Sequence, residues 1–377
     1  MGIKLKGITW AHTRGYVPMV ATAQRFNELN PEIEIEWEKR SLRDFENAPV
    51  EQLAEKYDLL IIDHPWAGFA SKNGVLIPLE KYLSKDFLDD QLKNSVGQSH
   101  LSYNFDGFQS ALAVDAACPV CVYRPEYFAD KNLPKDWNEL LELAKTGIVI
   151  FAGQPIYLLM DFYMLCSTLS DNLFKTDKVI DDATGILVLE KMRELAGYCT
   201  KEIFSWNTIK VNEILSSESD YYYCPYVYGF SNYSRAGYAR HILKAGDIIQ
   251  YEGRQMSAVL GGTGLAVSSK CRNIDAAIKY VEFTASKEIQ KTLLFDNGGQ
   301  PGHREAWLDN EVNRRSLNFF KDTLKTLDNS YLRPRYDGYL YFQDNAGEIV
   351  RDFIKDGGNV KDTLEKINSL YKKSRSK

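Results

Sequence analysis

The chain has 377 residues and carries 46 basic against 51 acidic side chains, so its formal charge is −5. At roughly 150 residues per domain, this length suggests two domains. A net negative chain argues against nucleic-acid binding, which needs a basic face to release counterions. No apolar run approaches the roughly 18 residues of a membrane-spanning helix, so we expect none.

Alternating strand and helix patterns in the first sixty residues predict an α/β fold. Residues 3–10 form the first predicted strand. After the polar turn 12–15, a helix places apolar residues at spacings of four and three until an Asn-Pro pair stops it. Strand 33–37 alternates with glutamates, and the continuous apolar run 59–62 is typical of a central parallel strand.

Three predicted loops come after these strands along the chain, at 10–14, 41–43 and 63–66. In open α/β sheets, ligands bind beyond the carboxyl ends of the strands. The loops are therefore candidate site loops. His12 and His64 each follow a strand, and each is either a hydrogen-bonding partner for a ligand or a structural histidine.

The rest of the chain continues the α/β pattern and ends in a largely helical third. Strands are predicted at 111–115 and 119–123, a second α/β segment begins at 147–151, and helices are predicted at 137–145, from 181 to about 199, at 274–285 and from 286 to 298.

Six cysteines occur, but only Cys118 and Cys121 form a close pair. A zinc ribbon needs a second such pair, so the sequence predicts no metal site and no cofactor, and most thiols should be buried. The chain opens directly on strand-like sequence, without the basic and apolar regions of a signal peptide. Either the protein is cytoplasmic or a signal peptide has been removed.

Tyrosine is concentrated between residues 221 and 238, where average usage would place about one. The seven are Tyr221, Tyr222, Tyr223, Tyr226, Tyr228, Tyr233 and Tyr238. Glycine, serine, asparagine and arginine lie among them, a composition typical of adaptable polar recognition. A sugar fits it, because its C–H bonds pack on an aromatic face while its hydroxyls need hydrogen-bond partners. The alternative is an exposed strand and loop without a function.

A second cluster spans residues 333–341, where Arg333 and Arg335 flank a proline. An arginine pair can hold a carboxylate or phosphate in bidentate fashion. It can equally form structural ion pairs with a nearby acid such as Asp337.

The familiar enzyme motifs GxSxG, HExxH and GxxxxGK[ST] do not occur. The run 261–264 is glycine-rich but lacks the lysine of a phosphate loop. A carboxylate pair for glycoside hydrolysis could come from Asp63, Asp115, Asp161 and Asp337.

In the order of these features, the chain resembles the family 1 extracellular solute-binding proteins of bacterial ABC transporters, which include maltose-type carbohydrate binders. The clearest segments are the glycine-rich strand 260–268, the helix 274–285, the helix start 286–290 and the turn 298–301. Residues 8–37, 58–63 and 137–140 are similar to other motifs of the family.

The resemblance implies an α/β fold of the type II periplasmic-binding-protein kind, with two lobes joined by hinge segments and a ligand cleft between them. It implies an N-terminal lobe of 1–113 plus 262–310 and a C-terminal lobe of 117–258 plus 315–377. The crossings would lie near 114–116, 259–261 and 311–314.

The resemblance also implies a ligand site without catalytic residues. One side would carry Trp10, His12, Arg14, Arg43, Asp63, His64 and Trp66. The other would carry Tyr157, Asp161, Tyr223, Tyr226 and Tyr228, with Gly262, Thr263, His303 and Arg335 near the crossings. The arginines leave an acidic sugar open as the ligand.

The function implied is the solute-binding component of an ABC importer, which binds a mono- or oligosaccharide by hinge closure. The expected partners are the carbohydrate and the permease subunits, with a monomeric protein in the periplasm or tethered outside the membrane. Two alternatives stay open, a carboxylate-dependent glycoside hydrolase or lyase and a sensory sugar-binding module.

Overall fold

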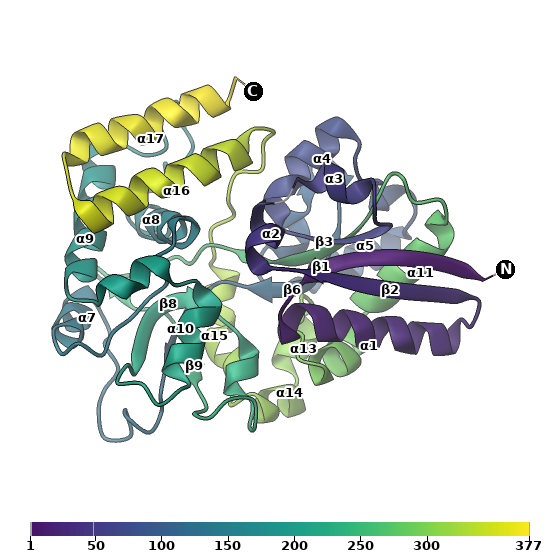
Figure 1. Cartoon of the computed structure of the whole chain (residues 1–377), viewed down its shortest axis with the longest axis horizontal. Helices are drawn as coiled ribbons and strands as arrows, with labels where there is room; N and C mark the ends of the chain where they lie inside the picture. The colour runs from purple at the N-terminus through teal and green to yellow at the C-terminus, as the bar shows by residue number, and fades with distance from the viewer. Residues whose placement is uncertain (1, 48, 377) are drawn as a thin grey trace. The chain divides into compact units, whose positions relative to one another are not determined.

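The computed structural model describes residues 2–47 and 49–376, and the chain divides into two compact units (Figure 1). The first unit holds the chain up to Ala117 together with Leu260–Leu324 and Arg335–Asp337. The second holds Cys118–Val259, Lys325–Pro334 and the chain from Gly338 onwards. No helix in the described ranges has the length and apolar character needed to cross a bilayer.

A five-stranded sheet forms the centre of the first unit, with strand order β2-β1-β3-β12-β6. Its strands are β1 (Ile3–Trp10), β2 (Ile33–Arg40), β3 (Leu59–Ile62), β6 (Leu112–Ala117) and β12 (Gly261–Val267). β1 runs parallel to β2 and β3, whereas β12 is antiparallel to β3 and β6. All four residues of β3 are buried, which confirms the predicted central strand.

Helices cover both faces of this sheet, with α1 on one side and α3 and α4 on the other (Figure 1). The helices lying wholly in this unit are α1 (Thr13–Leu29), α2 (Leu42–Asn47), α3 (Val50–Ala54), α4 (Ala67–Asn73), α5 (Lys85–Lys93), α6 (Ser99–Ser102), α11 (Ile274–Ala285), α12 (Lys287–Ile289), α13 (Arg304–Leu308) and α14 (Asn310–Arg315). A small hairpin joins β4 (Asn104–Phe105) to β5 (Phe108–Gln109). The predicted turn 12–15 is shorter than expected, because α1 already begins at Thr13.

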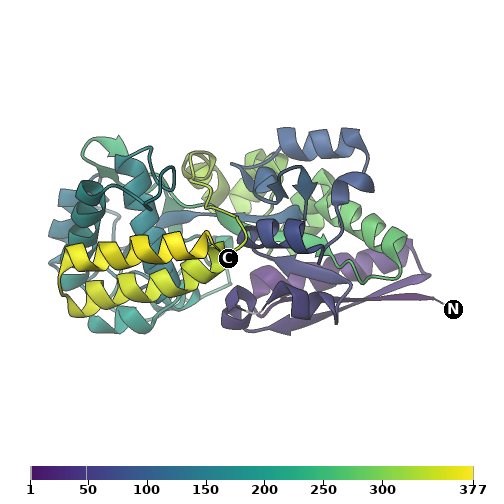
Figure 2. The same cartoon turned by 90° about the horizontal axis from the view of Figure 1, so that it is seen from above.

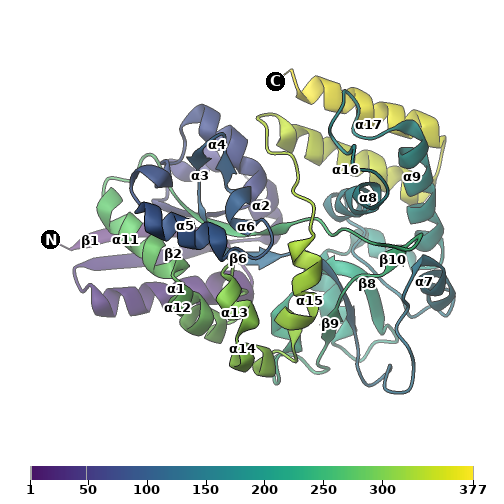
Figure 3. The same ribbon diagram turned by 180° about the vertical axis from the view of Figure 1, so that it is seen from behind.

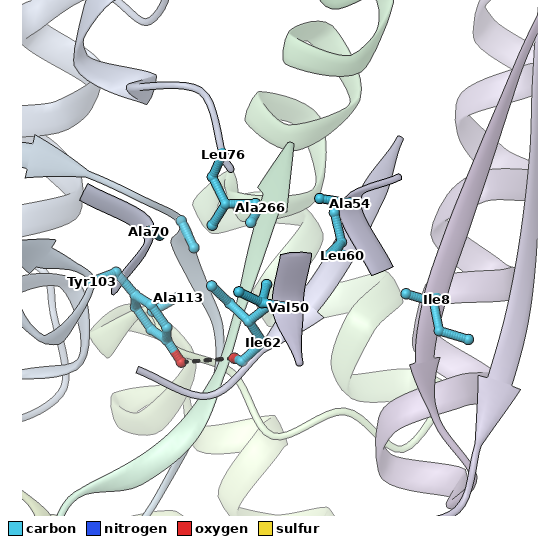
Figure 4. Packing of buried hydrophobic residues seen from close by; sticks show 11 residues of the cluster. Ile8, Val50, Ala54, Leu60, Ile62, Ala70, Leu76, Tyr103, Ala113 and Ala266 are labelled. Carbon is cyan, nitrogen blue, oxygen red and sulfur yellow. Dashed lines mark hydrogen bonds between the residues drawn. The ribbon is translucent and has the colours of Figure 1, made fainter. Parts of the chain in front are cut away.

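Alternation along the strands sends side chains to two apolar layers. Ile8, Leu60 and Ile62 face α3 and α4 and pack with Ala266 of β12 (Figure 4). The Tyr103 hydroxyl crosses this layer and donates a hydrogen bond to the Ile62 carbonyl oxygen at 3.3 Å. The layer therefore fixes the end of β3, where the candidate loop 63–66 begins.

The second unit is built on a three-stranded antiparallel sheet of order β8-β7-β9. Its strands are β7 (Pro119–Tyr123), β8 (Tyr223–Tyr228) and β9 (Lys244–Gly246), and a hairpin pairs β10 (Gln250–Tyr251) with β11 (Arg254–Gln255). Its helices are α7 (Trp137–Ala144), α8 (Pro155–Leu169), α9 (Asp182–Gly197), α10 (Thr208–Leu215), α16 (Tyr339–Asp356) and α17 (Val360–Ser374).

Helix α16 lies beside both α17 and α8. Figure 2 shows α16 and α17 side by side, and Figure 3 shows α8 next to α16. A Cβ on Gly347 would lie 2.8 Å from the Pro155 carbonyl oxygen, so the glycine permits the close approach of α16 to α8.

Residues 147–151, where the sequence places the start of a second α/β segment, run beside β8 for a short distance. Val149 bridges to Tyr223, and the Ile150 amide donates to the Tyr223 carbonyl oxygen at 3.0 Å. The chain then leaves the sheet, because the Gly153 amide donates to the Ile203 carbonyl oxygen instead. A Cβ on Gly153 would meet this oxygen at 2.7 Å.

The division into units differs from the predicted lobes in its last crossings. Helix α15 (Phe319–Asp328) belongs to the first unit as far as Leu324, although residues 315–377 were assigned to the second lobe. The reason is aromatic packing: Phe320 contacts Phe295 and Trp307 with ring centroids 5.8 and 5.0 Å apart.

Candidate functional site

Trp10 ends β1 and packs on the first turn of α1. Its ring stacks on His12 with centroids 5.4 Å apart and contacts Phe45 at 6.2 Å. A Cβ on Gly15 would lie 2.4 Å from the indole. Because neighbours of its own unit cover the ring, Trp10 supports His12 and does not offer the open face that a stacked sugar needs.

His12 caps the N-terminus of α1. Its Nδ1 accepts a hydrogen bond from the Arg14 backbone amide at 3.0 Å. Burial and the Arg14 cation lower the pKa of His12 to about 4. The imidazole is therefore neutral at pH 7, and because Nδ1 accepts, the proton resides on Nε2, which is a donor.

Arg14 is engaged within the first unit and is not a ligand clamp. Its Nε and terminal nitrogen donate to the two Asp115 carboxylate oxygens at 2.6 and 2.5 Å. Asp115 lies on β6 opposite Thr263 of β12. Next to it, Gly262 has φ +111, and a Cβ there would meet the Asp115 carbonyl oxygen at 2.3 Å. Gly262 thus allows the close strand pairing.

The loop after β3 contains both accessible and buried candidate residues. The Asp63 carboxylate accepts from the His64 amide at 2.8 Å and starts the short turn His64–Trp66. His64 is fully buried with its ring edge-on to Tyr103. Trp66 is half-buried, with its ring edge-on to Phe69 at 5.6 Å. Asp63 and Trp66 are therefore the accessible groups of this loop.

Arg335 anchors a chain segment in the first unit. Its guanidinium donates to the carbonyl oxygens of Leu101, Ser102 and Asn104 at 2.8, 2.9 and 2.6 Å. A Cβ on Gly68 would lie only 1.7 Å from the Arg335 carbonyl oxygen, so α4 and this segment touch. The guanidinium is occupied by backbone, contrary to its predicted place beside a ligand.

His303 also serves the local structure. It is buried, caps α13 by accepting from the Glu305 amide, and its Nε2 lies 3.3 Å from an Asp90 oxygen. The Arg43 side chain lies outside what the structure describes, so its predicted role is untested.

The second unit brings four predicted residues together around a small cavity of about 10 Å³. Tyr157 and Asp161 come from α8, and Tyr226 and Tyr228 come from β8. Sequence reasoning missed Thr208, the first residue of α10, which also lines it. Nothing in the sequence relates α10 to this wall. The rest of the lining is apolar and consists of Pro119, Ala152 and Val227. We call the cavity with its five polar residues the Asp161 pocket.

Tyr223 does not belong to this pocket. It contacts Phe128 and lines a separate groove with Tyr123. Between Cys224 and Val227 the pairing of β8 with β7 shifts register, so simple alternation does not hold along this strand.

Asp161 is 5% exposed, and burial raises the pKa of its carboxyl well above the ordinary value. Throughout residues 2–47 and 49–376, no hydrogen bond or ion pair reaches this carboxyl group. Among the same residues, no three His, Cys, Asp or Glu side chains are grouped as metal ligands would be. The six thiols are buried and unpaired.

Comparison with known proteins finds one matching family and several structures of similar fold. Residues 21–318 match the profile of a family described as bacterial extracellular solute-binding protein. The fold is similar to maltose-bound MalE3 of T. maritima, with a TM-score of 0.84 and 17% identity over 98% of this chain and 99% of that one.

Two further structures show the same fold. A solute-binding protein of an Agrobacterium radiobacter K84 ABC transporter, in complex with ribitol, has a TM-score of 0.83 and 18% identity, covering 99% of this chain and 98% of that one. The substrate-binding protein Lmo0181 of Listeria monocytogenes, in complex with cycloalternan, has a TM-score of 0.82 and 15% identity over 100% of both. The predicted two-lobe α/β fold is confirmed.

Proposed function

Because the chain belongs to the bacterial extracellular solute-binding proteins, as the match over residues 21–318 shows, we propose that it is the carbohydrate-binding component of an ABC importer. The family's location is extracellular or periplasmic. Tethering to a membrane, a monomeric state and delivery of the ligand to permease subunits are parts of the proposal. Closure of two lobes on the ligand is a further prediction of the resemblance.

The Asp161 pocket is the observation that supports a carbohydrate most directly. It combines phenol rings with a hydroxyl and a carboxyl group, which together suit the apolar faces and the hydroxyls of a sugar. In the first unit, His12, Asp63 and Trp66 provide a donor, an acceptor and a half-exposed ring at the carboxyl ends of β1 and β3. Similar structures hold maltose, ribitol and cycloalternan.

A thermal-shift screen against neutral sugars, polyols, sugar acids and amino sugars, followed by calorimetry, tests this proposal. A ligand at about 100 times its dissociation constant should stabilise the folded protein by about 2.7 kcal/mol. Trp66→Ala and Tyr228→Ala should each weaken binding by about 1–3 kcal/mol if the ring stacks on the sugar.

Matched controls come from exposed tyrosines elsewhere in each unit. Tyr82 is 44% exposed in the first unit and Tyr198 is 40% exposed in the second. Tyr82→Ala and Tyr198→Ala should leave the affinity unchanged. If no carbohydrate stabilises the protein, or if the controls weaken binding as much as the site variants, the assignment is wrong.

Catalysis is tested with the same ligand. We propose that the protein returns the sugar unchanged, because its family and structural relatives bind solutes. Long incubation followed by chromatography should recover only the intact ligand. A product that disappears in Asp63→Asn and Asp161→Asn variants would instead establish the glycoside hydrolase or lyase alternative.

A further inference from the structure

We propose that the Asp161 pocket receives a primary ammonium group of the ligand, so that the solute is an amino sugar and not a neutral or acidic one. The inference rests on the proposed function for the sugar part of the ligand. The ammonium requirement itself derives from the pocket alone.

The size of the pocket limits what can enter it. Its volume of about 10 Å³ is the space that one water-sized group occupies. A sugar ring does not fit, but one substituent projecting from a ring does. An ammonium group has this size, and its three N–H donors match the carboxylate, hydroxyl and phenol oxygens of Asp161, Thr208 and the tyrosines.

The charge of the pocket selects among substituents of that size. The titratable groups on which the Asp161 carboxyl acts are Tyr226 and Cys224 of β8, which are acids and whose pKa values are raised by burial and by this carboxyl. Cys199, which follows α9, adds another acid beside Tyr226. A buried carboxylate needs a cation, and these neighbours supply none.

Cations on the elements that pack against α8 have other partners. Arg254 of β11 donates to the Leu169 carbonyl oxygen at the end of α8. Lys191 of α9 pairs with Glu194 at 2.7 Å. Arg351 of α16 pairs with Glu348, also on α16, at 2.9 Å. Among residues 2–47 and 49–376, no cation pairs with Asp161, so we assign this role to the ligand.

The ring faces add to this preference. Tyr157, Tyr226 and Tyr228 surround the position that an ammonium would take, and cations are attracted to aromatic faces in desolvated sites. Two of the arginines predicted for an acidic sugar are already occupied, because Arg14 is bound by Asp115 and Arg335 by backbone carbonyl oxygens.

Binding of the ammonium would also move a proton. Without a ligand, burial holds the Asp161 carboxyl in its neutral form at a higher pH than usual. When the ammonium enters, the carboxyl ionises, the carboxylate pairs with the ammonium, and the proton passes to solvent. Affinity for the amine should therefore rise with pH until the free carboxyl is ionised or the free amine begins to lose its own proton, whereas affinity for a neutral sugar should not.

The test compares ligands that share a skeleton but differ in charge. Calorimetry is carried out with D-glucosamine, N-acetyl-D-glucosamine, D-glucose and the β-1,4-linked disaccharides of the first two, and with ethanolamine and 1-aminobutane as amines without a sugar. Titrations at pH 7 in two buffers of different ionisation enthalpy count the protons released.

We expect an amino sugar to bind at least tenfold more tightly than its N-acetyl counterpart, with net proton release. In Asp161→Asn the ratio of the two affinities should fall to near one and the proton release should vanish. Asp344→Asn is the control, because Asp344 on α16 has a pKa raised to about 6 by partial burial and could itself release a proton. Proton release should persist in that variant.

The outcomes separate the two proposals. Neutral sugars that bind as tightly as the amines, or a preference that survives Asp161→Asn, would overturn the ammonium inference and leave the carbohydrate function standing. Simple amines that bind through Asp161 while sugars do not would support the inference and overturn the carbohydrate function. If none of these ligands binds, the ammonium inference is wrong, and the thermal-shift screen decides the carbohydrate function separately.

Discussion

The buried ion pair between Arg14 and Asp115 should be the most sensitive polar contact of the first unit. Their side chains are only 5% and 7% exposed, and two hydrogen bonds join them. Arg14→Met removes the cation and leaves the carboxylate buried without its partner. Breaking a buried pair in this way costs about 3–5 kcal/mol of unfolding free energy.

An exposed pair of the same geometry provides the matched control. Arg314 donates to both carboxylate oxygens of Glu311 at 2.7 and 2.6 Å, but these side chains are 71% and 58% exposed. Arg314→Met should cost only a small fraction of the loss in Arg14→Met, because water already solvates both charges.

Urea unfolding followed by tryptophan fluorescence measures the difference. The double variant Arg14→Met with Asp115→Leu should recover most of the stability, since apolar side chains can replace a buried pair without leaving a charge. Equal losses in Arg14→Met and Arg314→Met would refute the reasoning that burial sets the cost. A double variant as unstable as the sum of its single variants would refute it as well.

Three further predictions concern stability. Gly68→Ala should cost about 1–3 kcal/mol, because its Cβ would overlap the Arg335 carbonyl oxygen, and limited proteolysis near residue 335 should become faster. Folding lowers the pKa values of His12 and His100 to about 4, so the stability they contribute is present above pH 6.5 and lost as the pH falls toward 4, by up to about 3 kcal/mol each. Replacing either histidine by glutamine should make the thermal midpoint less dependent on pH in this range. An unchanged dependence on pH would contradict the assignment. Folding raises the pKa of Asp161, so the free-energy cost of this carboxyl to the folded state grows as the pH rises above 3.8. Asp161→Asn should therefore raise the thermal midpoint at pH 7 more than at pH 4.

Local sequence patterns predicted most of the fold because they reflect local burial. The apolar run 59–62 became β3, and the helical spacing at 274–285 became α11. The run 147–151 has similar composition but pairs with β8 only around Val149, because the Gly153 amide already donates to a distant carbonyl oxygen at Ile203. Such competition between distant partners leaves no trace in a local pattern.

The candidate site was harder to predict, for a related reason. Arg14 and Asp115 are 101 residues apart in the chain, and the Arg335 side chain finds its carbonyl oxygens more than 230 residues away. Sequence shows that an arginine can hold an anion but does not show whether the protein already supplies its partner. Strand alternation could not have separated Tyr223 from Tyr226 and Tyr228, because the register of β8 shifts between Cys224 and Val227.

The position of β12 between β3 and β6 has a consequence during synthesis. β12 begins roughly 140 residues after β6 has ended, although it is the neighbour of β6 in the sheet and the second neighbour of β3, beside β1. At roughly 5–20 residues per second, a ribosome would need about 7–28 s to deliver that strand. Throughout this interval β3 presents an unpaired edge, which chaperones that hold nascent chains would have ample time to cover.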